Sequence, residues 1–301
     1  MICFNISHVK GVFFMKLKPV VGFANQKGGV GKTTWSKTFS EYVSMVKGKT
    51  TLGIDMDSQT SFTARFFDMY KNPVTDLREP PIHPYFDPSL TEGWDGKSSI
   101  ADIFFGKIPR PYPTQIINLD VVPSDEGGLI KAENVKRQEM ADRIYSQLHN
   151  FLVLEDVQAN YDVFVVDTPP AKGPLTISSF KAMTHLVIPL EIEFQAIEGL
   201  AGILQLWKQE SLCRPKDFPL TLVGILPNKL HSRRSSDNGL LEDLKKHPVH
   251  GGYVLPVQAV DRSEFPVCDL EKKSIFNFPD SNLAKREAVS ICEYIFKEVF
   301  E

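Results

Sequence analysis

The sequence predicts an α/β protein with one doubly wound, mostly parallel sheet that is flanked by helices. Two observations favour this class. Short apolar stretches typical of buried strands alternate with stretches of helical periodicity from about residue 18 to the end. The chain also shows no internal repeat and no clear linker, so these elements fit a single domain.

The expected elements follow from this alternation. We expect strands at 20–24, 50–55, 117–122, 161–167, 185–190, 220–226 and 253–256. We expect helices at 35–46, 99–105, 135–154 and 281–299, and another that begins near residue 193. Between them, 71–97 holds five prolines among Asp, Glu and Gly, which predicts a loop or an irregular subdomain.

The composition sets limits on the function. A chain of 301 residues with 42% apolar and 24% charged residues is typical of a globular protein with a full core. The net charge of −3 means that any contact with nucleic acid must come from a local patch. The four cysteines are far apart and include no Cys-x-x-Cys pair, which argues against a disulfide framework or a cysteine metal site and suits a reducing cytoplasm.

A glycine-rich turn stands between the first predicted strand and the first predicted helix. It reads Lys-Gly-Gly-Val-Gly-Lys-Thr-Thr over 27–34. Glycines let backbone N–H groups approach a phosphate closely, and the helix N-terminus adds a favourable dipole. Lys32 adds positive charge at the outer phosphates, and the Thr33 hydroxyl can bind Mg²⁺. We therefore expect nucleotide contacts from Lys27, Gly28, Gly29, Val30, Gly31, Lys32, Thr33 and Thr34.

Carboxylates follow two of the predicted strands. Asp55 and Asp57 end the second strand, at the edge of a parallel sheet where ligands bind. Asp167 ends an apolar run that indicates a central strand, where it can hold the Mg²⁺ shell as a Walker B carboxylate does. The residues alone thus predict a Mg²⁺-dependent nucleoside triphosphatase. Its metal contacts would be Thr33, Asp55, Asp57 and Asp167, and its catalytic residues Lys27, Lys32 and Asp57.

Three motifs together resemble the ParA/MinD family of ATPases. The 27–34 turn lacks the first glycine of the G-x-x-x-x-G-K-[ST] pattern, where Gln26 stands, and carries the extra Lys27, as in that family's deviant Walker A loop. The 55–59 stretch resembles the family's Asp-x-Asp-Pro-Gln, with Ser58 in place of proline, which makes the turn less rigid. The 167–170 stretch matches its Asp-x-Pro-Pro. The resemblance covers about 16–299 except 71–97, which we expect to be an insertion.

The resemblance implies a switch ATPase that uses ATP and Mg²⁺ and dimerises on ATP. Lys27 would reach the partner subunit's phosphates across a nucleotide-sandwich homodimer, and Asp57 would orient the hydrolytic water. The 168–176 loop would sense the γ-phosphate. Hydrolysis would be slow and stimulated by a ParB-like or adaptor protein. The protein would bind DNA without sequence preference and position a plasmid, a chromosome or another cargo, as a cytoplasmic, nucleoid-associated protein without membrane contact.

Three residues are candidates for contact with the base. Asn228 follows the sixth predicted strand, and its amide offers both a donor and an acceptor to a purine edge. A simple turn residue is an equally good interpretation of Asn228. The resemblance places adenine near the segment after the last predicted strand, which implicates Pro256 and Val257.

A basic group after the sixth strand is the candidate DNA contact. It consists of Arg233, Arg234, Lys245 and Lys246. Asp237, Glu242 and Asp243 are interleaved with these residues, so an ordinary solvated helix face is the competing interpretation. Contact by this group would be to the DNA backbone and would weaken with salt.

Three alternatives share the phosphate loop or the fold. A MinD-like membrane-associated positioning ATPase needs a basic terminal helix, whereas this one carries Glu293, Glu298 and Glu301. An iron–sulfur carrier needs paired cysteines, which the sequence lacks. An ATP-dependent metabolic ligase of related fold would not need Lys27.

The first residues form a separate expectation. Residues 1–14 are apolar, but His8 and Lys10 interrupt them and no basic region precedes them, so they make a poor signal peptide. We expect Met15 to be the native initiator, 1–14 to be an extension, and 15–301 to be the ATPase domain.

Overall fold

A seven-stranded sheet forms the centre of the computed structural model, which describes residues 17–90, 93–134, 138–170, 172–231 and 235–301. The strand order is β5-β6-β2-β7-β1-β8-β9. All neighbours pair in parallel except the short edge strand β5, which pairs antiparallel with β6. The strands are β1 Val20–Phe23, β2 Thr51–Asp55, β5 Tyr112–Pro113, β6 Leu119–Val122, β7 Val163–Asp167, β8 His185–Glu191 and β9 Thr221–Asn228.

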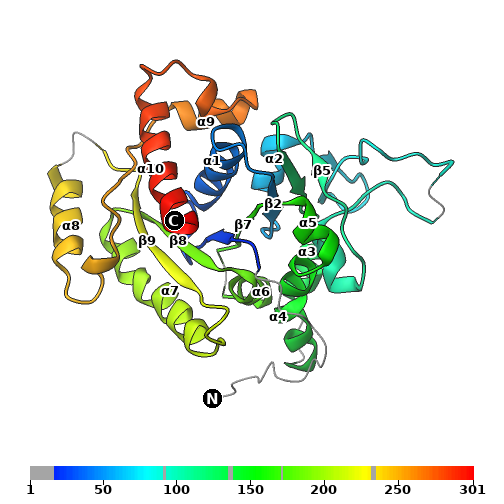
Figure 1. Cartoon of the computed structure of the whole chain (residues 1–301), viewed down its shortest axis with the longest axis horizontal. Helices are drawn as coiled ribbons and strands as arrows, with labels where there is room; N and C mark the ends of the chain where they lie inside the picture. Colours follow the sequence, from blue (N-terminus) through cyan, green and yellow to red (C-terminus); the bar gives the residue numbers. More distant parts are fainter. Residues whose placement is uncertain (1–16, 91–92, 135–137, 171, 232–234) are drawn as a thin grey trace.

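Helices cover both faces of this sheet, with α1 and α10 on one face and α4, α6 and α7 on the other (Figure 1). The α-helices are α1 Lys32–Met45, α2 Ser61–Phe66, α3 Glu126–Glu133, α4 Gln138–Leu152, α5 Glu155–Asn160, α6 Pro174–Ala182, α7 Phe194–Leu212, α8 Ser235–Lys246, α9 Glu264–Glu271 and α10 Leu283–Phe300. The 3₁₀ helices are η1 Ile100–Phe105, η2 Gly251–Tyr253 and η3 Ile275–Asn277. The predicted doubly wound α/β fold is confirmed.

The apolar run in β7 shows why the central strands carry no polar face. Val163 and Val165 pack into the cluster with α1 and α10, whereas Phe164 and Val166 pack into the cluster under α6 and α7. All four side chains are fully buried. Each contributes about 1.5–3 kcal/mol relative to exposure, and this two-sided burial fixes the strand that ends in Asp167.

One predicted strand is wrong. Residues 253–256 form no strand, because η2 runs to Tyr253 and only Val254 makes a β-bridge, with Ile225 of β9. The next residue, Leu255, donates its N–H to the Ile225 carbonyl, and Pro256 has no N–H with which to extend the ladder. The chain therefore follows the second half of β9 in parallel through separate contacts, which include the Ala259 N–H to the Pro227 carbonyl at 2.9 Å, without forming a continuous strand.

The short helices α2 and α5 were not predicted, and three longer helices were missed because glycine or proline obscures their periodicity. The α3 helix contains Gly127 and Gly128, α6 begins with Pro174, and α9 contains Pro266. Tertiary packing outweighs these local preferences, since Leu129, Leu175 and Cys268 are buried.

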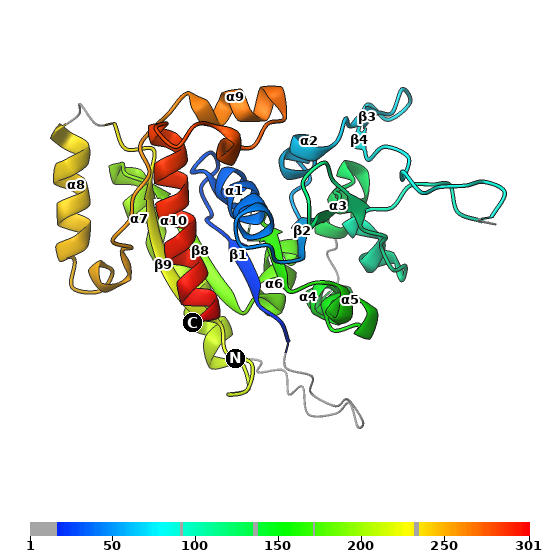
Figure 2. The same cartoon turned by 45° about the horizontal axis from the view of Figure 1, so that its top comes forward.

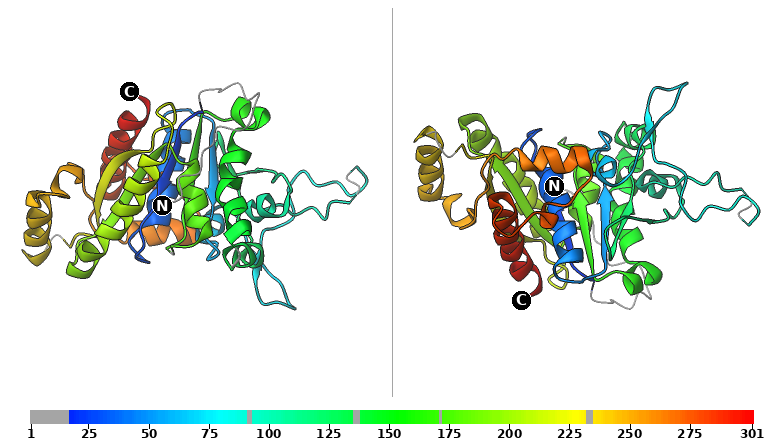
Figure 3. Two further views of the ribbon diagram at one scale, coloured as in Figure 1. Left: turned by 90° about the horizontal axis from the view of Figure 1, so that it is seen from below. Right: turned by 90° about the horizontal axis from the view of Figure 1, so that it is seen from above.

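The 71–97 segment is irregular, as predicted, but it is packed. It begins with a short hairpin, in which β3 Tyr70–Lys71 pairs antiparallel with β4 Arg78–Glu79. Beyond β4, the buried ring of His83 lies 4.5 Å from Tyr112 and 5.6 Å from Trp94, centroid to centroid. The segment projects from the side of the molecule opposite α8 (Figures 2 and 3).

Two further expectations concern the first residues of the chain and its relation to a membrane. Residues 1–14 lie outside the described residues, so the expected extension stays untested. No helix in the described ranges combines the length and the apolar character needed to cross a membrane.

Candidate functional site

The predicted phosphate loop connects β1 to α1 at the middle of the sheet, where β1 lies between β7 and β8. Gly29 and Gly31 have φ values of 76° and 96°, in the left-handed region that favours glycine. A Cβ on Gly31 would lie 2.2 Å from Asn228 Nδ2, so this position also lacks room for a side chain. A Cβ on Gly28 or Gly29 would meet nothing within 4 Å, which leaves the outer face of the loop open to a ligand.

Lys32 and Thr33 begin α1 and face the carboxylate of Asp167. The Lys32 side chain is buried and donates from Nζ to the Lys27 carbonyl at 3.3 Å. Burial lowers the pKa of Lys32, and the charges of Asp167 and Asp57 oppose that shift. Thr33 Oγ1 donates to Asp167 Oδ2 at 2.7 Å, and Ser36 Oγ donates to Oδ1 at 3.0 Å. Ser36 was not predicted, although it stands one turn after Lys32 on the same helix face.

Asp55 and Asp167 are neighbours on adjacent strands, because they are paired residues in the β2–β7 register. Both are fully buried, and burial is the main cause that raises the pKa of each carboxyl. Asp55 Oδ2 accepts hydrogen bonds from Thr63 N, Thr63 Oγ1 and Ser124 Oγ at 2.7–2.9 Å. Oδ1 accepts a single hydrogen bond, from Asp57 N at 3.1 Å, so of the two Asp55 oxygens it is the one with a lone pair left for a cation. Thr63 and Ser124 were not predicted as parts of the site.

The oxygen atoms gathered here suit a hard divalent cation. The Thr33 hydroxyl and the Asp167 carboxylate lie within one hydrogen bond of each other. Among the residues that the structure describes, no group of three or more His, Cys, Asp or Glu side chains forms a ready metal cage. Mg²⁺ typically uses one or two carboxylates together with substrate phosphates, so these residues fit it without such a cage.

Asp57 lies on a tight turn between β2 and α2. Its side chain is 8% exposed, and Oδ1 accepts from Gln59 N at 3.0 Å. Thr60 N donates to the Asp57 carbonyl at 3.0 Å, which closes a β-turn over Ser58 and Gln59. Burial raises the pKa of Asp57, and the charge of Lys32 opposes this shift. The carboxylate is thus held next to the phosphate loop, with one of its oxygens fixed by the turn.

Lys27 takes part in an ion pair within the subunit. Its ammonium contacts the carboxylate of Glu193, the residue that precedes α7. Its backbone N–H donates to Asn25 Oδ1 at 3.1 Å. The side chain is 36% exposed. Its predicted reach to a partner subunit stays a prediction.

The loop after β7 is anchored at both ends. Thr168 Oγ1 donates to the Phe23 carbonyl of β1 at 2.9 Å. At the other end, Leu175 N in the first turn of α6 donates to Glu133 Oε2 at 3.1 Å. Glu133 comes from α3, so this helix, absent from the predicted elements, holds the start of α6 in place.

The candidate base contacts have different surroundings. Asn228 is buried, donates from Nδ2 to the Val30 carbonyl at 2.7 Å and accepts from Trp35 Nε1 at 3.0 Å. The structure therefore gives its amide a supporting role beneath the phosphate loop, and contact with a purine stays a prediction. Pro256 is exposed, next to the carboxyl end of β9.

The candidate DNA contacts are described only in part. Arg233 and Arg234 lie outside the described residues. Lys245 and Lys246 are exposed in the last turn of α8, and Lys245 Nζ lies 3.3 Å from Glu242 Oε1. This neighbour leaves the solvated-face interpretation open.

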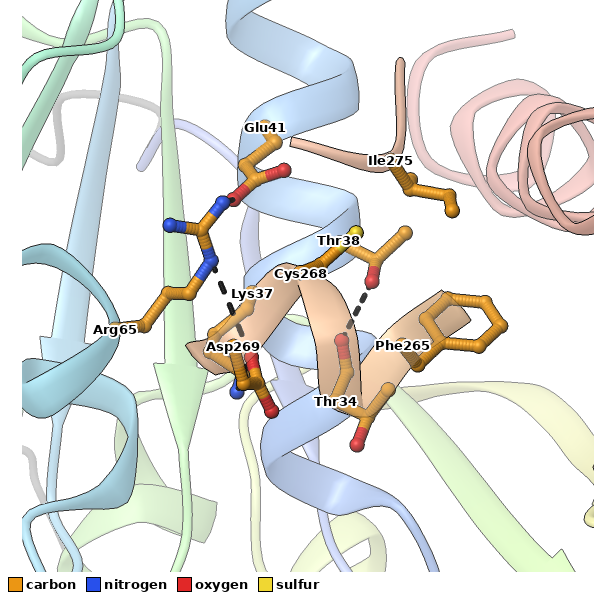
Figure 4. A pocket seen from close by; sticks show the side chains of 9 residues that line it. All are labelled: Thr34, Lys37, Thr38, Glu41, Arg65, Phe265, Cys268, Asp269 and Ile275. Carbon is orange, nitrogen blue, oxygen red and sulfur yellow. Dashed lines mark hydrogen bonds and ion pairs between the residues drawn. The ribbon is translucent and has the colours of Figure 1, made fainter. Parts of the chain in front are cut away.

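A buried ionic cluster lies on the far side of α1 from the sheet, between α1, α2 and α9 (Figure 4). Arg65 Nη2 lies 2.7 Å from Glu41 Oε1, and each side chain is only 4% exposed. Lys37 Nζ lies 2.6 Å from Asp269 Oδ1 of α9. The cluster joins the helix after the phosphate loop to the helix after Asp57, and its central space of about 10 Å³ has room for one water.

Comparison with known proteins agrees with this geometry. A protein-family model described as an AAA domain matches residues 18–212. Sporulation initiation inhibitor protein Soj of Bacillus subtilis is 29% identical over 230 residues, which are 76% of this chain and 79% of Soj. A Borrelia burgdorferi plasmid partition protein bound to AMPPNP has a TM-score of 0.67 at 20% identity, covering 93% of this chain and 99% of that one. Cobyrinic acid a,c-diamide synthase of Mycobacterium smegmatis, with bound ATP analogue and magnesium, has a TM-score of 0.68 at 20% identity over 95% and 96%.

The two solved structures show the shared fold, and the family model matches well over half of the chain. The relatives also include chromosome-partitioning ATPase Soj of Treponema pallidum, 29% identical over 62% of each chain. The chain therefore belongs to the AAA domain family, as a ParA-type ATPase with the deviant Walker A loop.

Proposed function

We propose that this protein is an ATP-driven dimerising switch that binds DNA without sequence preference and positions a plasmid, a chromosome or another cargo. The observation that carries the proposal is the pair of lysines on one loop. Lys32 faces the carboxylates from inside the site, whereas Lys27 stands at the loop entrance on a partly exposed side chain. A lysine at the rim is suited to reach a second subunit, which a monomeric phosphate site does not need.

The chemistry follows from the groups around the loop. ATP phosphates would lie against the N–H groups at 28–33 and the start of α1. Thr33 and Asp167 would hold Mg²⁺, which neutralises charge on the β- and γ-phosphates when bound. Lys32 would stabilise the charge on the outer phosphates, and Asp57 would orient the attacking water.

The partners follow from the same proposal. We infer a homodimer with ATP and a ParB-like or adaptor protein that stimulates slow hydrolysis. The DNA surface would include Lys245 and Lys246 on α8. The protein would then be found in the cytoplasm with the nucleoid.

The test is binding to non-specific duplex DNA with ATP, with ADP and without nucleotide, at low and moderate salt. ATP-dependent binding that weakens with salt, and that Lys27→Ala abolishes, supports the proposal. Lys18→Ala is the matched control, because Lys18 is 35% exposed, pairs with Asp162 and lies before β1, at the opposite end of that strand from the loop. Absence of binding with every nucleotide contradicts it.

A second candidate function is an ATP-dependent metabolic ligase. The observation that favours it is the TM-score of cobyrinic acid a,c-diamide synthase, which is as high as that of the plasmid partition protein. ATP turnover that persists in Lys27→Ala and needs an added carboxylic acid substrate would favour the ligase.

A further inference from the structure

The turn that carries Asp57 is contacted from outside by the hairpin that begins the 71–97 segment. Arg78, the first residue of β4, reaches across to this turn. Its Nη1 donates to the Gln59 carbonyl at 3.2 Å and, more weakly, to Thr60 Oγ1 at 3.5 Å. These contacts join a part of the chain with no assigned role to the turn that holds a predicted catalytic carboxylate.

The backbone of Arg78 is itself held in place. Its N–H donates to Glu126 Oε2, in the first turn of α3, at 2.9 Å. Within the hairpin it is paired with Lys71. Glu79, the next residue, lies 2.6 Å from Lys97 Nζ and also accepts from Asn72 Nδ2 at 2.6 Å. The guanidinium of Arg78 therefore extends from a strand that is itself fixed, so it can restrain the turn that it contacts.

The Asp57 turn has features that make an external restraint useful. Ser58 occupies the second position of the β-turn, where proline would fix φ near the required value. Thr60 has a φ of 57°, a left-handed conformation that costs a non-glycine residue free energy. The Asp57 carboxylate is oriented through Gln59 N–H. The Gln59 residue is thus held by Asp57 through its N–H and by Arg78 through its carbonyl.

We propose that Arg78 is a positioning residue for Asp57. The hairpin supplies from outside the turn the rigidity that proline would supply from within it. This inference rests on the proposed role of Asp57 in ATP hydrolysis. On this proposal, the hairpin that carries Arg78 influences the rate of ATP hydrolysis, although it lies outside the phosphate loop and the central sheet.

The first test compares Arg78→Ala with Lys71→Ala in the full chain. Lys71 lies opposite Arg78 in the hairpin and pairs with Asp76, so its loss matches the charge change without touching the turn. Arg78→Ala should lower single-turnover ATP hydrolysis about three- to tenfold, while ATP affinity changes by less than about twofold. Lys71→Ala should change neither quantity, and both variants should unfold at similar urea concentrations.

The second test adds Ser58→Pro. If Arg78 acts by ordering the turn, proline at the second turn position should restore most of the hydrolysis lost in Arg78→Ala. The same substitution in the wild-type chain should have a smaller effect, because the turn is already braced. A simple loss of folding would not be rescued in this way.

A third measurement does not depend on activity. Amide hydrogen exchange of Gln59 and Thr60, whose N–H groups bond to Asp57, should be faster in Arg78→Ala than in Lys71→Ala. Unchanged exchange, or hydrolysis and ATP affinity lost in parallel, overturns the inference. If the wild type binds no ATP, the proposed function fails, whereas the exchange result still decides whether Arg78 orders the turn.

Discussion

The buried pair of Glu41 and Arg65 allows a stability prediction in depth. Arg65→Ala would leave the Glu41 carboxylate in a site where it is only 4% exposed. Removing one partner of a buried ion pair costs about 3–5 kcal/mol, because the other charge stays desolvated. Lys37 lies near enough to stabilise the Glu41 charge in part, so we expect a loss of about 3 kcal/mol. That is a large share of the roughly 5–15 kcal/mol that stabilises a typical domain.

The pH dependence of this loss follows from the same carboxylate. Burial raises the pKa of Glu41, and Arg65 is the largest effect that opposes the shift. Without Arg65 the pKa rises further, so the folded state binds a proton that the unfolded state releases above its ordinary pKa of 4.5. The deficit of Arg65→Ala should therefore grow as the pH rises past the raised pKa that Glu41 has in the folded wild type, and it should shrink below that pKa.

The assay is urea unfolding of the wild type and the variant at several pH values. The double variant with Glu41→Ala should recover at least half of the loss, because no unpaired charge remains buried. Lys71→Ala, which breaks an exposed pair with Asp76, should cost no more than about 0.5 kcal/mol. An Arg65→Ala variant within about 1 kcal/mol of the wild type would refute the argument that this pair is desolvated.

Two further predictions concern the loop and the sheet. Gly31→Ala should weaken ATP binding by more than about tenfold, because its φ of 96° disfavours alanine and its Cβ would displace Asn228. A nucleotide titration checks this against Gly48→Ala, which has a φ of 65° but open space around the Cβ, and similar losses in both would contradict the steric part. Burial lowers the pKa of His185 to about 4, so the neutral imidazole stabilises the fold above the unfolded pKa of 6.5. That stability should fall between pH 6.5 and 4 in urea unfolding, and a His185→Gln variant with an equal decline over this range would contradict it.

The sequence was most informative where one local pattern determines one structure. The glycines at 28, 29 and 31 and the apolar run before Asp167 each have few structural solutions, and the loop and the strand that they form lie where they were predicted. The strand order could not be read from such patterns, because it depends on which crossovers the helices make. The adjacency of Asp55 and Asp167 is therefore a result of the β2–β7 pairing.

The residues that sequence reasoning missed act at long range. Ser124 and Glu133 are common residue types in unremarkable local sequence, yet folding brings them to Asp55 and to the start of α6. Arg78 could not be connected to Asp57 either, because its contact crosses from a proline-rich segment to a distant turn. For Asn228, the sequence predicted the position at a strand end but did not predict the contact that the amide makes. The amide donates to the Val30 carbonyl and so supports the phosphate loop.

The most direct test of the central claim is the mass of the protein with nucleotide. Sedimentation velocity should be run with ATP, with ADP and without nucleotide on Asp57→Ala, which should hold ATP without hydrolysing it, and on the same variant with Lys27→Ala. We predict a dimer only with ATP, and a monomer under all conditions once Lys27 is removed. A dimer with ATP that does not need Lys27, or a monomer with ATP in Asp57→Ala, would contradict the claim that Lys27 acts across a nucleotide-dependent dimer.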